Sequence, residues 1–247
     1  MARHLLVIGA QRCGTTRLYH LLDAHPEIAM ARPARPEPKV FLSDELASRG
    51  PEWYRATYFA HATAEMLLGE KSTSYLEDPA APRRAAAVLG SAEIVVQLRD
   101  PVARAVSNWR FSTAHGVEDR PLQQALEENL RGPRAWDRTR TSVSPFAYLE
   151  RGCYISHLEP WLDSFPGTVH IRFLEEGGAL SPVSQLYASL GVDAGFRPPH
   201  EQDRVNASAG SEPVLPDALL RELREHFRPC DARLSELLGR PLPWAAS

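Results

Sequence analysis

The segment that most constrains the fold of this chain is residues 5–16, LLVIGAQRCGTT. Its apolar first part predicts a strand that is buried on both faces, as strands of a parallel sheet are. A turn bounded by Gly9 and Gly14 follows, and Thr15 is expected to begin a helix. Backbone N–H groups in such a turn, together with the positive end of the helix dipole, favour the binding of an anion.

The turn differs at one position from the phosphate-binding P-loop of nucleotide kinases and NTPases. Its spacing is close to G-x-x-x-x-G-K-[ST], but Thr15 stands where those proteins have lysine, and Arg12 is the cation inside the loop. The absent lysine is the group that reaches the γ-phosphate in Mg-NTP chemistry. We therefore expect the loop to bind a phosphate ester without performing ordinary ATP hydrolysis.

Strand and helix patterns alternate along the rest of the chain. Strands are expected at residues 4–8, 27–30, 66–69, 93–98 and 168–173, and helices at 15–24, 53–59, 79–89, 101–111, 122–130, 154–165, 181–190 and 216–238. Over 247 residues this alternation predicts a single α/β domain, residues 1–247. Its expected architecture is a three-layer, P-loop-like fold with a central, mainly parallel sheet flanked by helices.

Polar residues follow three of the predicted strands. The first strand ends in the 9–16 turn, the third in residues 70–72 (EKS) and the fourth in residues 99–101 (RDP). Ligands of such sheets bind at the carboxyl ends of the strands. Lys39 and Lys71 are the only lysines, and the net charge is −3. Cations gathered at strand ends of an acidic chain predict one polyanionic ligand.

Composition excludes several other classes of protein. A net charge of −3 gives no support for a nucleic-acid-binding protein. Cys13, Cys153 and Cys230 are odd in number and far apart, so we expect neither a disulfide framework nor a zinc site, and a reducing cytoplasm as the compartment. No signal peptide or membrane-spanning stretch is expected. The excess of arginine, proline and alanine indicates a GC-rich bacterial genome.

Residues 99–107, RDPVARAVS, form a second candidate anion site. Asp100 can cap the following helix, and Pro101 suits its first turn. Arg99 at the strand end and Ser107, two turns into the helix, can together bind a second phosphate. The alternative is an ordinary strand-to-helix cap whose arginine is simply solvated.

Together these motifs resemble those of the sulfotransferases that use 3′-phosphoadenosine 5′-phosphosulfate (PAPS). Residues 9–16, followed by Leu18, Leu21, Leu22 and HP at 25–26, are similar to the family's 5′-phosphosulfate loop, and residues 99–107 to its 3′-phosphate motif. Further matches at residues 70–75, 81–85 and 152–159 most resemble the heparan-sulfate-type sulfotransferases and their soluble bacterial relatives. The resemblance extends over about residues 4–240.

The resemblance also implies roles for particular residues. Arg12 matches the loop cation and Lys71 a lysine at the reaction centre. Glu37 falls at the position of the general base, although Pro36 and Lys39 replace a lysine and a histidine of the family pattern. The implied cofactor-binding residues are Arg12, Cys13, Gly14, Thr15, Thr16, Arg99, Ser107, Arg204 and Ser208.

The expected activity is transfer of the sulfuryl group from PAPS to a hydroxyl of a carbohydrate, lipid or natural-product small molecule, releasing adenosine 3′,5′-bisphosphate. No metal, nucleic-acid partner or membrane anchor is expected. Three alternatives stay open at this point: a histidine as the base, a small-molecule P-loop kinase, and a nucleotide-binding domain without chemistry.

Overall fold

The computed structural model describes residues 3–137, 139, 141, 143–176, 183–199 and 213–245. The chain groups into two compact units. The first comprises residues 1–98 and 157–206, and the second comprises residues 99–156 and 207–247. A single domain over residues 1–247 stays a prediction.

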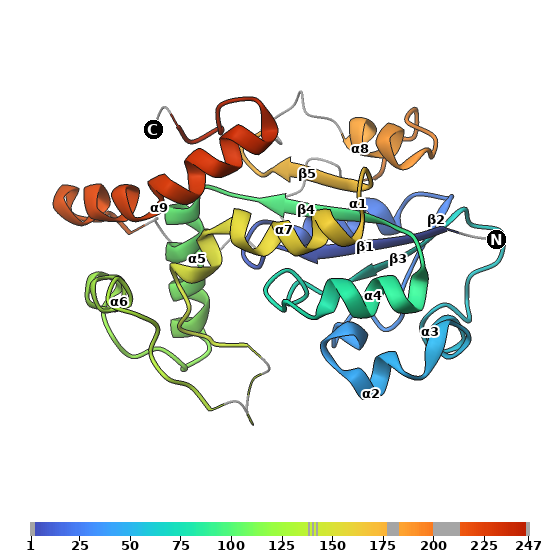
Figure 1. Ribbon diagram of the computed structural model, residues 1–247, viewed down its shortest axis with the longest axis horizontal. Helices are drawn as coiled ribbons and strands as arrows, with labels where there is room; N and C mark the ends of the chain where they lie inside the picture. The colour runs from blue at the N-terminus through green and yellow to red at the C-terminus, as the bar shows by residue number, and fades with distance from the viewer. Residues whose placement is uncertain are drawn as a thin grey trace. The chain divides into compact units, whose positions relative to one another are not determined.

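The first unit is built around a five-stranded sheet with the order β2-β3-β1-β4-β5, in which every neighbouring pair is parallel (Figure 1). The strands are β1 (Arg3–Gly9), β2 (Ile28–Met30), β3 (Leu67–Lys71), β4 (Ala92–Leu98) and β5 (Val169–Phe173). Residues 5–8 are fully buried, as the unbroken apolar run predicts. The α/β fold with a parallel central sheet is confirmed.

Helices lie along both faces of this sheet. Leu5 and Val7 belong to a buried cluster that also holds Leu22 of α1 and Leu186 of α8. Figure 1 draws α4 on the other, nearer side. The helices of this unit are α1 (Thr15–Asp23), α2 (Asp44–Ala47), α3 (Gly50–Tyr58), α4 (Ala81–Leu89) and α8 (Val183–Leu190), with η1 (Val40–Leu42) and the part of α7 (Tyr154–Ser164) from residue 157 onward.

The short elements η1 and α2 are absent from the sequence-based expectation. Each is no longer than one turn, so neither repeats an apolar residue at helical spacing. Helix α2 depends instead on a local cap, because the Ser43 hydroxyl accepts a hydrogen bond from the Leu46 N–H at 3.3 Å.

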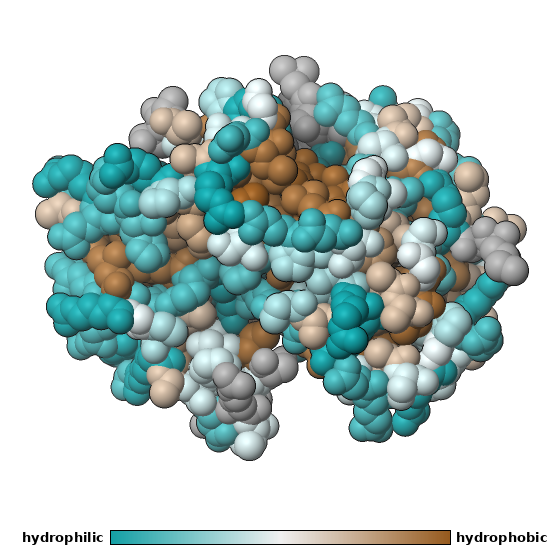
Figure 2. Space-filling model, viewed as in Figure 1, coloured by the Kyte–Doolittle hydropathy of each residue, from teal (hydrophilic) through white to brown (hydrophobic). Residues whose placement is uncertain are grey.

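The second unit packs helices α5 (Pro101–Ala114), α6 (Leu122–Asn129) and α9 (Asp217–Leu238) around one apolar cluster. The short η2 (Glu150–Gly152) directly follows Leu149, which belongs to that cluster. Gly152 lies where these elements approach closely. A Cβ at this position would be 2.5 Å from the Phe227 ring and 2.9 Å from Pro101 Cβ. The viewer-facing side of α9 is mainly hydrophilic (Figure 2), while its Leu223 and Phe227 are buried.

The expectation that no cysteines pair is wrong. Cys153 and Cys230 form a disulfide within the second unit, with their Cα atoms 5.3 Å apart, while Cys13 is buried as a free thiol. The pair is separated by 77 residues in sequence, so spacing alone carried no sign of it. Because disulfides are typical of oxidising compartments, this finding removes the basis on which a reducing cytoplasm was predicted.

In the part of the chain that the structure describes, no helix is long and apolar enough to span a membrane.

A buried carboxylate organises the connection between α5 and α6 in the second unit. The Glu118 side chain is fully buried and accepts hydrogen bonds from Arg120 Nη2 at 2.6 Å and from the Tyr148 hydroxyl at 2.7 Å. Burial by itself would raise the pKa of this carboxyl, but these hydrogen bonds outweigh it and lower the pKa from 4.5 to about 2.

This network predicts a stability that depends on pH. A folded-state pKa below the unfolded value contributes stability above about pH 4.5, which is lost as the pH falls towards about 2. We expect Glu118→Gln to lower the free energy of unfolding near neutral pH, and its difference from wild type to shrink on acidification. Urea unfolding at several pH values measures this. Glu222→Gln, at an exposed position on α9, is the control; the same pH-dependent difference there would contradict the prediction.

Candidate active site

The turn after β1 is fastened by a side chain of β4. The Ala10 N–H donates to the Gln97 carbonyl at 2.8 Å, and Gln97 Nε2 donates to the Cys13 carbonyl at 2.5 Å. The Cys13 N–H closes the turn onto the Ala10 carbonyl at 3.3 Å. Arg12 lies inside this turn with a positive φ of 68°. The turn predicted from the two glycines is therefore a closed loop held by the neighbouring strand.

Gly14 joins this turn to α1 and is required there for two reasons. Its φ of 78° lies in the left-handed region, and a Cβ would lie 2.9 Å from both Gln97 Nε2 and Leu174 Cδ1. The first hydrogen bond of the helix runs from the Leu18 N–H to the Gly14 carbonyl at 3.2 Å. The N–H groups of Thr15 and Thr16 precede that bond and are not used within the helix, so this end of α1 has the form of an anion site.

The residues after β3 run beside the same turn. The Ser72 N–H donates to the Val7 carbonyl at 3.1 Å, and the Leu76 N–H donates to the Ile8 carbonyl at 3.0 Å. Gln11 Nε2 also lies 3.4 Å from Ser74 Oγ. The structure thus brings the end of β3 next to the 9–16 turn, as the parallel arrangement predicts.

Glu37 and Lys71 meet at this place. Lys71 Nζ forms an ion pair with Glu37 Oε1, and the Thr73 N–H donates to Glu37 Oε2 at 3.0 Å. The Thr73 hydroxyl lies 3.2 Å from the same oxygen. The Lys71 side chain is only 9% exposed and the Glu37 side chain only 17% exposed. Two residues singled out separately in the sequence are therefore in direct contact.

Glu70 is a functional-site neighbour that the sequence reasoning did not identify. Its side chain is fully buried and accepts hydrogen bonds from the hydroxyls of Tyr54, Ser72 and Tyr75, each at 2.6 Å. Burial raises the pKa of this carboxyl, and the three hydroxyl donors act in the opposite direction. The available signal was an acidic residue within the otherwise buried run of β3, next to Lys71.

Arg99 and Ser107 belong to the second unit. Arg99 is the residue after β4, and the predicted cap is confirmed, because Asp100 Oδ1 accepts from the Val102 N–H at 2.9 Å. Arg224 of α9 binds both carboxylate oxygens of Asp100 at 2.8 Å, and the Tyr154 hydroxyl donates to the Arg99 carbonyl at 2.8 Å. The convergence of Arg99 and Ser107 with the 9–16 turn stays a prediction.

Two further predicted cofactor-binding residues, Arg204 and Ser208, lie outside the described residues.

His25, one of the alternative bases, has a packing role. It is 1% exposed, its Nδ1 accepts from the Glu27 N–H at 3.1 Å, and its Nε2 lies 3.0 Å from the Asp193 carbonyl. Its ring is in edge contact with Tyr187 and Phe196. Both ring nitrogens therefore have backbone partners.

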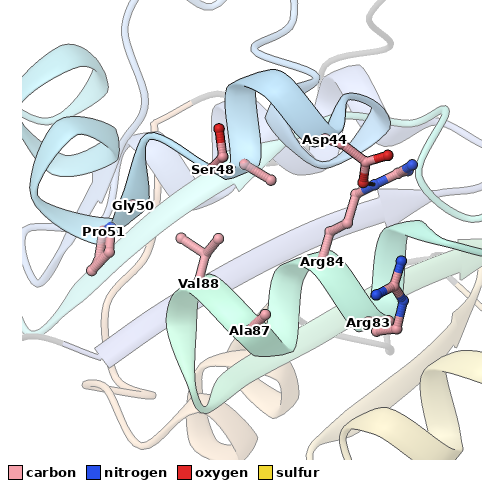
Figure 3. Close-up of a pocket in the computed structure, with 9 residues that line it drawn as sticks. Asp44, Ser48, Gly50, Pro51, Arg83, Arg84, Ala87 and Val88 are labelled. Atoms are coloured by element: carbon pink, nitrogen blue, oxygen red, sulfur yellow. Dashed lines mark hydrogen bonds and ion pairs between the residues drawn. The ribbon is translucent and has the colours of Figure 1, made fainter.

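A separate cavity of about 290 Å³ lies between α2 and α4 (Figure 3). Arg84 crosses it to pair with Asp44, at 2.6 Å between Nε and Oδ1. None of the predicted site residues is among those that line it. Among the described residues, no group of three or more histidine, cysteine, aspartate or glutamate side chains is arranged to hold a metal ion.

Several known proteins are similar to this chain. Residues 2–173 match the family model for a sulfotransferase domain. Heparan sulfate glucosamine 3-O-sulfotransferase 3B1 of Mus musculus is 25% identical over 264 residues, which cover 97% of this chain and 64% of that protein. Bifunctional heparan sulfate N-deacetylase/N-sulfotransferase 1 of Mus musculus is 34% identical over 167 residues, which cover 65% of this chain and 18% of that protein. The chain thus spans less than two thirds of the length of these relatives.

A solved structure is similar over the whole chain. The crystal structure of a sulfotransferase from Alicyclobacillus acidocaldarius matches with a TM-score of 0.77 and 26% identity, covering 98% of each chain. This likeness includes both compact units and therefore extends beyond the residues that the family model matches.

The geometry of Gly14 predicts a defect with two separable parts. Gly14→Ala places a methyl group in the left-handed region, which costs about 1 kcal/mol, and it also pushes Gln97 off the Cys13 carbonyl. Gly167→Ala is the matched control, because Gly167 has the same φ of 78° but no atom within 4 Å of the added Cβ.

We expect both variants to lose stability and only Gly14→Ala to lose, in addition, the binding of inorganic pyrophosphate to the turn. Thermal unfolding and calorimetric titration measure the two effects. Equal losses of stability with unchanged pyrophosphate binding would show that Gly14 has no special role.

Proposed function

Because this chain belongs to the sulfotransferase domain family, we propose that it transfers the sulfuryl group of PAPS to an acceptor hydroxyl and releases adenosine 3′,5′-bisphosphate. The observation that carries the proposal is the contact of Glu37 with Lys71 beside the 9–16 turn. A carboxylate, an ammonium group and an anion-binding loop are the three groups that this reaction needs.

The 9–16 turn binds the 5′-phosphosulfate in this proposal. The N–H groups from Gly14 to Thr16 and the hydroxyls of Thr15 and Thr16 contact its oxygens, and Cys13 contributes backbone to the same loop. The guanidinium of Arg12 neutralises the phosphate oxygen that becomes negatively charged as the sulfuryl group leaves. Support comes from the closed form of the turn and from the N–H groups at the start of α1 that bond to no carbonyl within the helix, as far as the described residues show.

Transfer itself is an in-line displacement at sulfur. A bond forms between the acceptor oxygen and sulfur while the bond between sulfur and the 5′-phosphate oxygen breaks, and Glu37 takes the proton of the acceptor hydroxyl. Lys71 stabilises the negative charge on the transferring group. In the structure Lys71 is paired with Glu37, so an acceptor hydroxyl and the sulfuryl group would each take over one partner of this pair.

The 3′-phosphate is assigned to Arg99 and Ser107 in the second unit. The Asp100 cap and its pairing with Arg224 support this assignment, since they fix the strand-to-helix connection that carries Arg99. Arg204 and Ser208 are proposed to complete the nucleotide site. The bound 3′-phosphate would distinguish PAPS from ATP.

The names of the relatives do not fix the chemical class of the acceptor. One relative is named as a 3-O-sulfotransferase and another as an N-sulfotransferase, so hydroxyl and amine acceptors both occur among them. We propose that the acceptor group is a hydroxyl of a carbohydrate, lipid or natural-product small molecule, and that the reaction proceeds without a metal in a bacterium. Product mass after incubation with PAPS and a panel of alcohols, phenols, sugars and amines tests this; transfer to amines alone would contradict the O-specificity.

Nucleotide preference separates this function from a kinase. We expect calorimetry to show that adenosine 3′,5′-bisphosphate binds at least tenfold more tightly than ATP, because two sites for phosphate are occupied at once, a difference of about 1.4 kcal/mol. Its binding should not require magnesium. Tighter binding of Mg-ATP would favour the P-loop kinase and end the sulfotransferase proposal.

Glu37→Gln tests the general base. We expect the variant to keep its affinity for adenosine 3′,5′-bisphosphate and to lose on the order of 10²–10⁴-fold in turnover, the usual contribution of a positioned base. Glu45→Gln, which removes an exposed carboxyl from nearby α2, is the control and should retain wild-type turnover. Full turnover by Glu37→Gln would transfer the role to another group.

A further inference from the structure

We propose that Glu70 is a positioning residue, whose buried carboxylate holds the loop that carries Glu37 through the hydroxyls of Ser72 and Tyr75. The inference rests on the proposed function in one respect, because it takes Glu37 as the base. In the described residues Glu70 makes no hydrogen bond or ion pair with Glu37 or with the 9–16 turn, although the charges of the Glu70 and Glu37 carboxyl groups repel each other. Its effect on the reaction would pass through the backbone of residues 37–41.

The direction of each hydrogen bond carries the argument. The hydroxyls of Ser72 and Tyr75 both donate to Glu70 Oε1, each with an oxygen–oxygen distance of 2.6 Å, so their hydrogens point at this carboxyl oxygen. With their hydrogens committed, both hydroxyl oxygens can serve the loop only as acceptors. Glu70 therefore fixes the orientation of both groups.

Those two oxygens bind the loop just after Glu37. Ser72 Oγ accepts from the Lys39 N–H at 2.9 Å, and the Tyr75 hydroxyl accepts from the Phe41 N–H at 3.1 Å. Lys39 has a φ of 54°, a left-handed conformation that non-glycine residues adopt only when their surroundings hold them there. A half-buried hydrogen bond at the Lys39 N–H and a buried one at the Phe41 N–H supply that restraint.

Tyr54 provides an internal control. Its hydroxyl also donates to Glu70 at 2.6 Å, and its side chain is 1% exposed, so it resembles Tyr75 in burial and in its contact with the carboxylate. In the described part of the chain it makes no hydrogen bond to the backbone of residues 37–41. Loss of this hydroxyl disturbs the same carboxylate without releasing the loop.

The paired substitutions give different expectations. We expect Tyr75→Phe and Ser72→Ala each to lower kcat for sulfuryl transfer about tenfold or more, because a displacement of a reacting group by about 1 Å can cost about 10²-fold in rate. Affinity for adenosine 3′,5′-bisphosphate should change less than about twofold, because the 9–16 turn is untouched. Tyr54→Phe should lower the melting temperature to a similar extent and leave kcat within about twofold of wild type.

Glu70 is tested directly by two replacements. The single amide oxygen of Glu70→Gln can still accept from Ser72 and Tyr75 while its NH₂ group donates to the Tyr54 hydroxyl, so this variant should keep most of the wild-type kcat. Glu70→Ala removes the acceptor altogether and should lose more kcat than either hydroxyl variant. Equal kcat values for the Gln and Ala variants would overturn the inference.

Amide hydrogen exchange, followed residue by residue by NMR, supplies a readout that does not need activity. Exchange of the Phe41 amide should accelerate in Tyr75→Phe and that of the Lys39 amide in Ser72→Ala, with neither changed in Tyr54→Phe. The inference is overturned if these amides exchange at wild-type rates, or if Tyr54→Phe loses as much kcat as Tyr75→Phe. If the wild type transfers no sulfuryl group, the proposed function fails, and the exchange rates alone decide whether Glu70 holds the loop.

Discussion

The pairing of β1 with a parallel strand on each side is the constraint on which the site depends. Because Val7 is aligned with Lys71, the end of β3 lies beside the end of β1, and two further backbone hydrogen bonds extend that pairing to Leu76. On the other side, β4 supplies Gln97, which holds both ends of the 9–16 turn. A change in register on either side would separate the 9–16 turn from Lys71 and from the Gln97 contacts that hold the turn.

The ion pair of Lys71 and Glu37 is better explained by chemistry than by stability. Desolvating two charges costs several kcal/mol per ion, and the attraction between them often does no more than offset that cost. Both side chains are largely buried, at 9% and 17% exposure. The proposed reaction needs a cation for one substrate and a base for the other, close to each other. In the absence of substrates these two charged groups would remain paired with each other.

The sequence predicted this arrangement where its signals were local or periodic. The five strands, the Asp100 cap and the roles of Gly9 and Gly14 in the turn followed from apolar runs and from residues with special backbone or capping properties. The resemblance to a family selected Glu37 and Lys71, whose contact spans 34 residues of sequence. The disulfide and the hydrogen bonds of the hydroxyls around Glu70 were not predicted from the sequence. Each joins residues of common types that are brought together only when the chain folds.

The Glu70 network also explains how the loop can depart from the family pattern and still present its glutamate. Lys39 replaces a histidine of that pattern, yet the contact that fixes residue 39 is made by its backbone N–H to Ser72 Oγ. Any residue except proline can donate that hydrogen bond, so replacing histidine by lysine at position 39 preserves it. The backbone of residue 39, through this hydrogen bond, therefore restrains the loop that carries Glu37 whether a histidine or a lysine stands there.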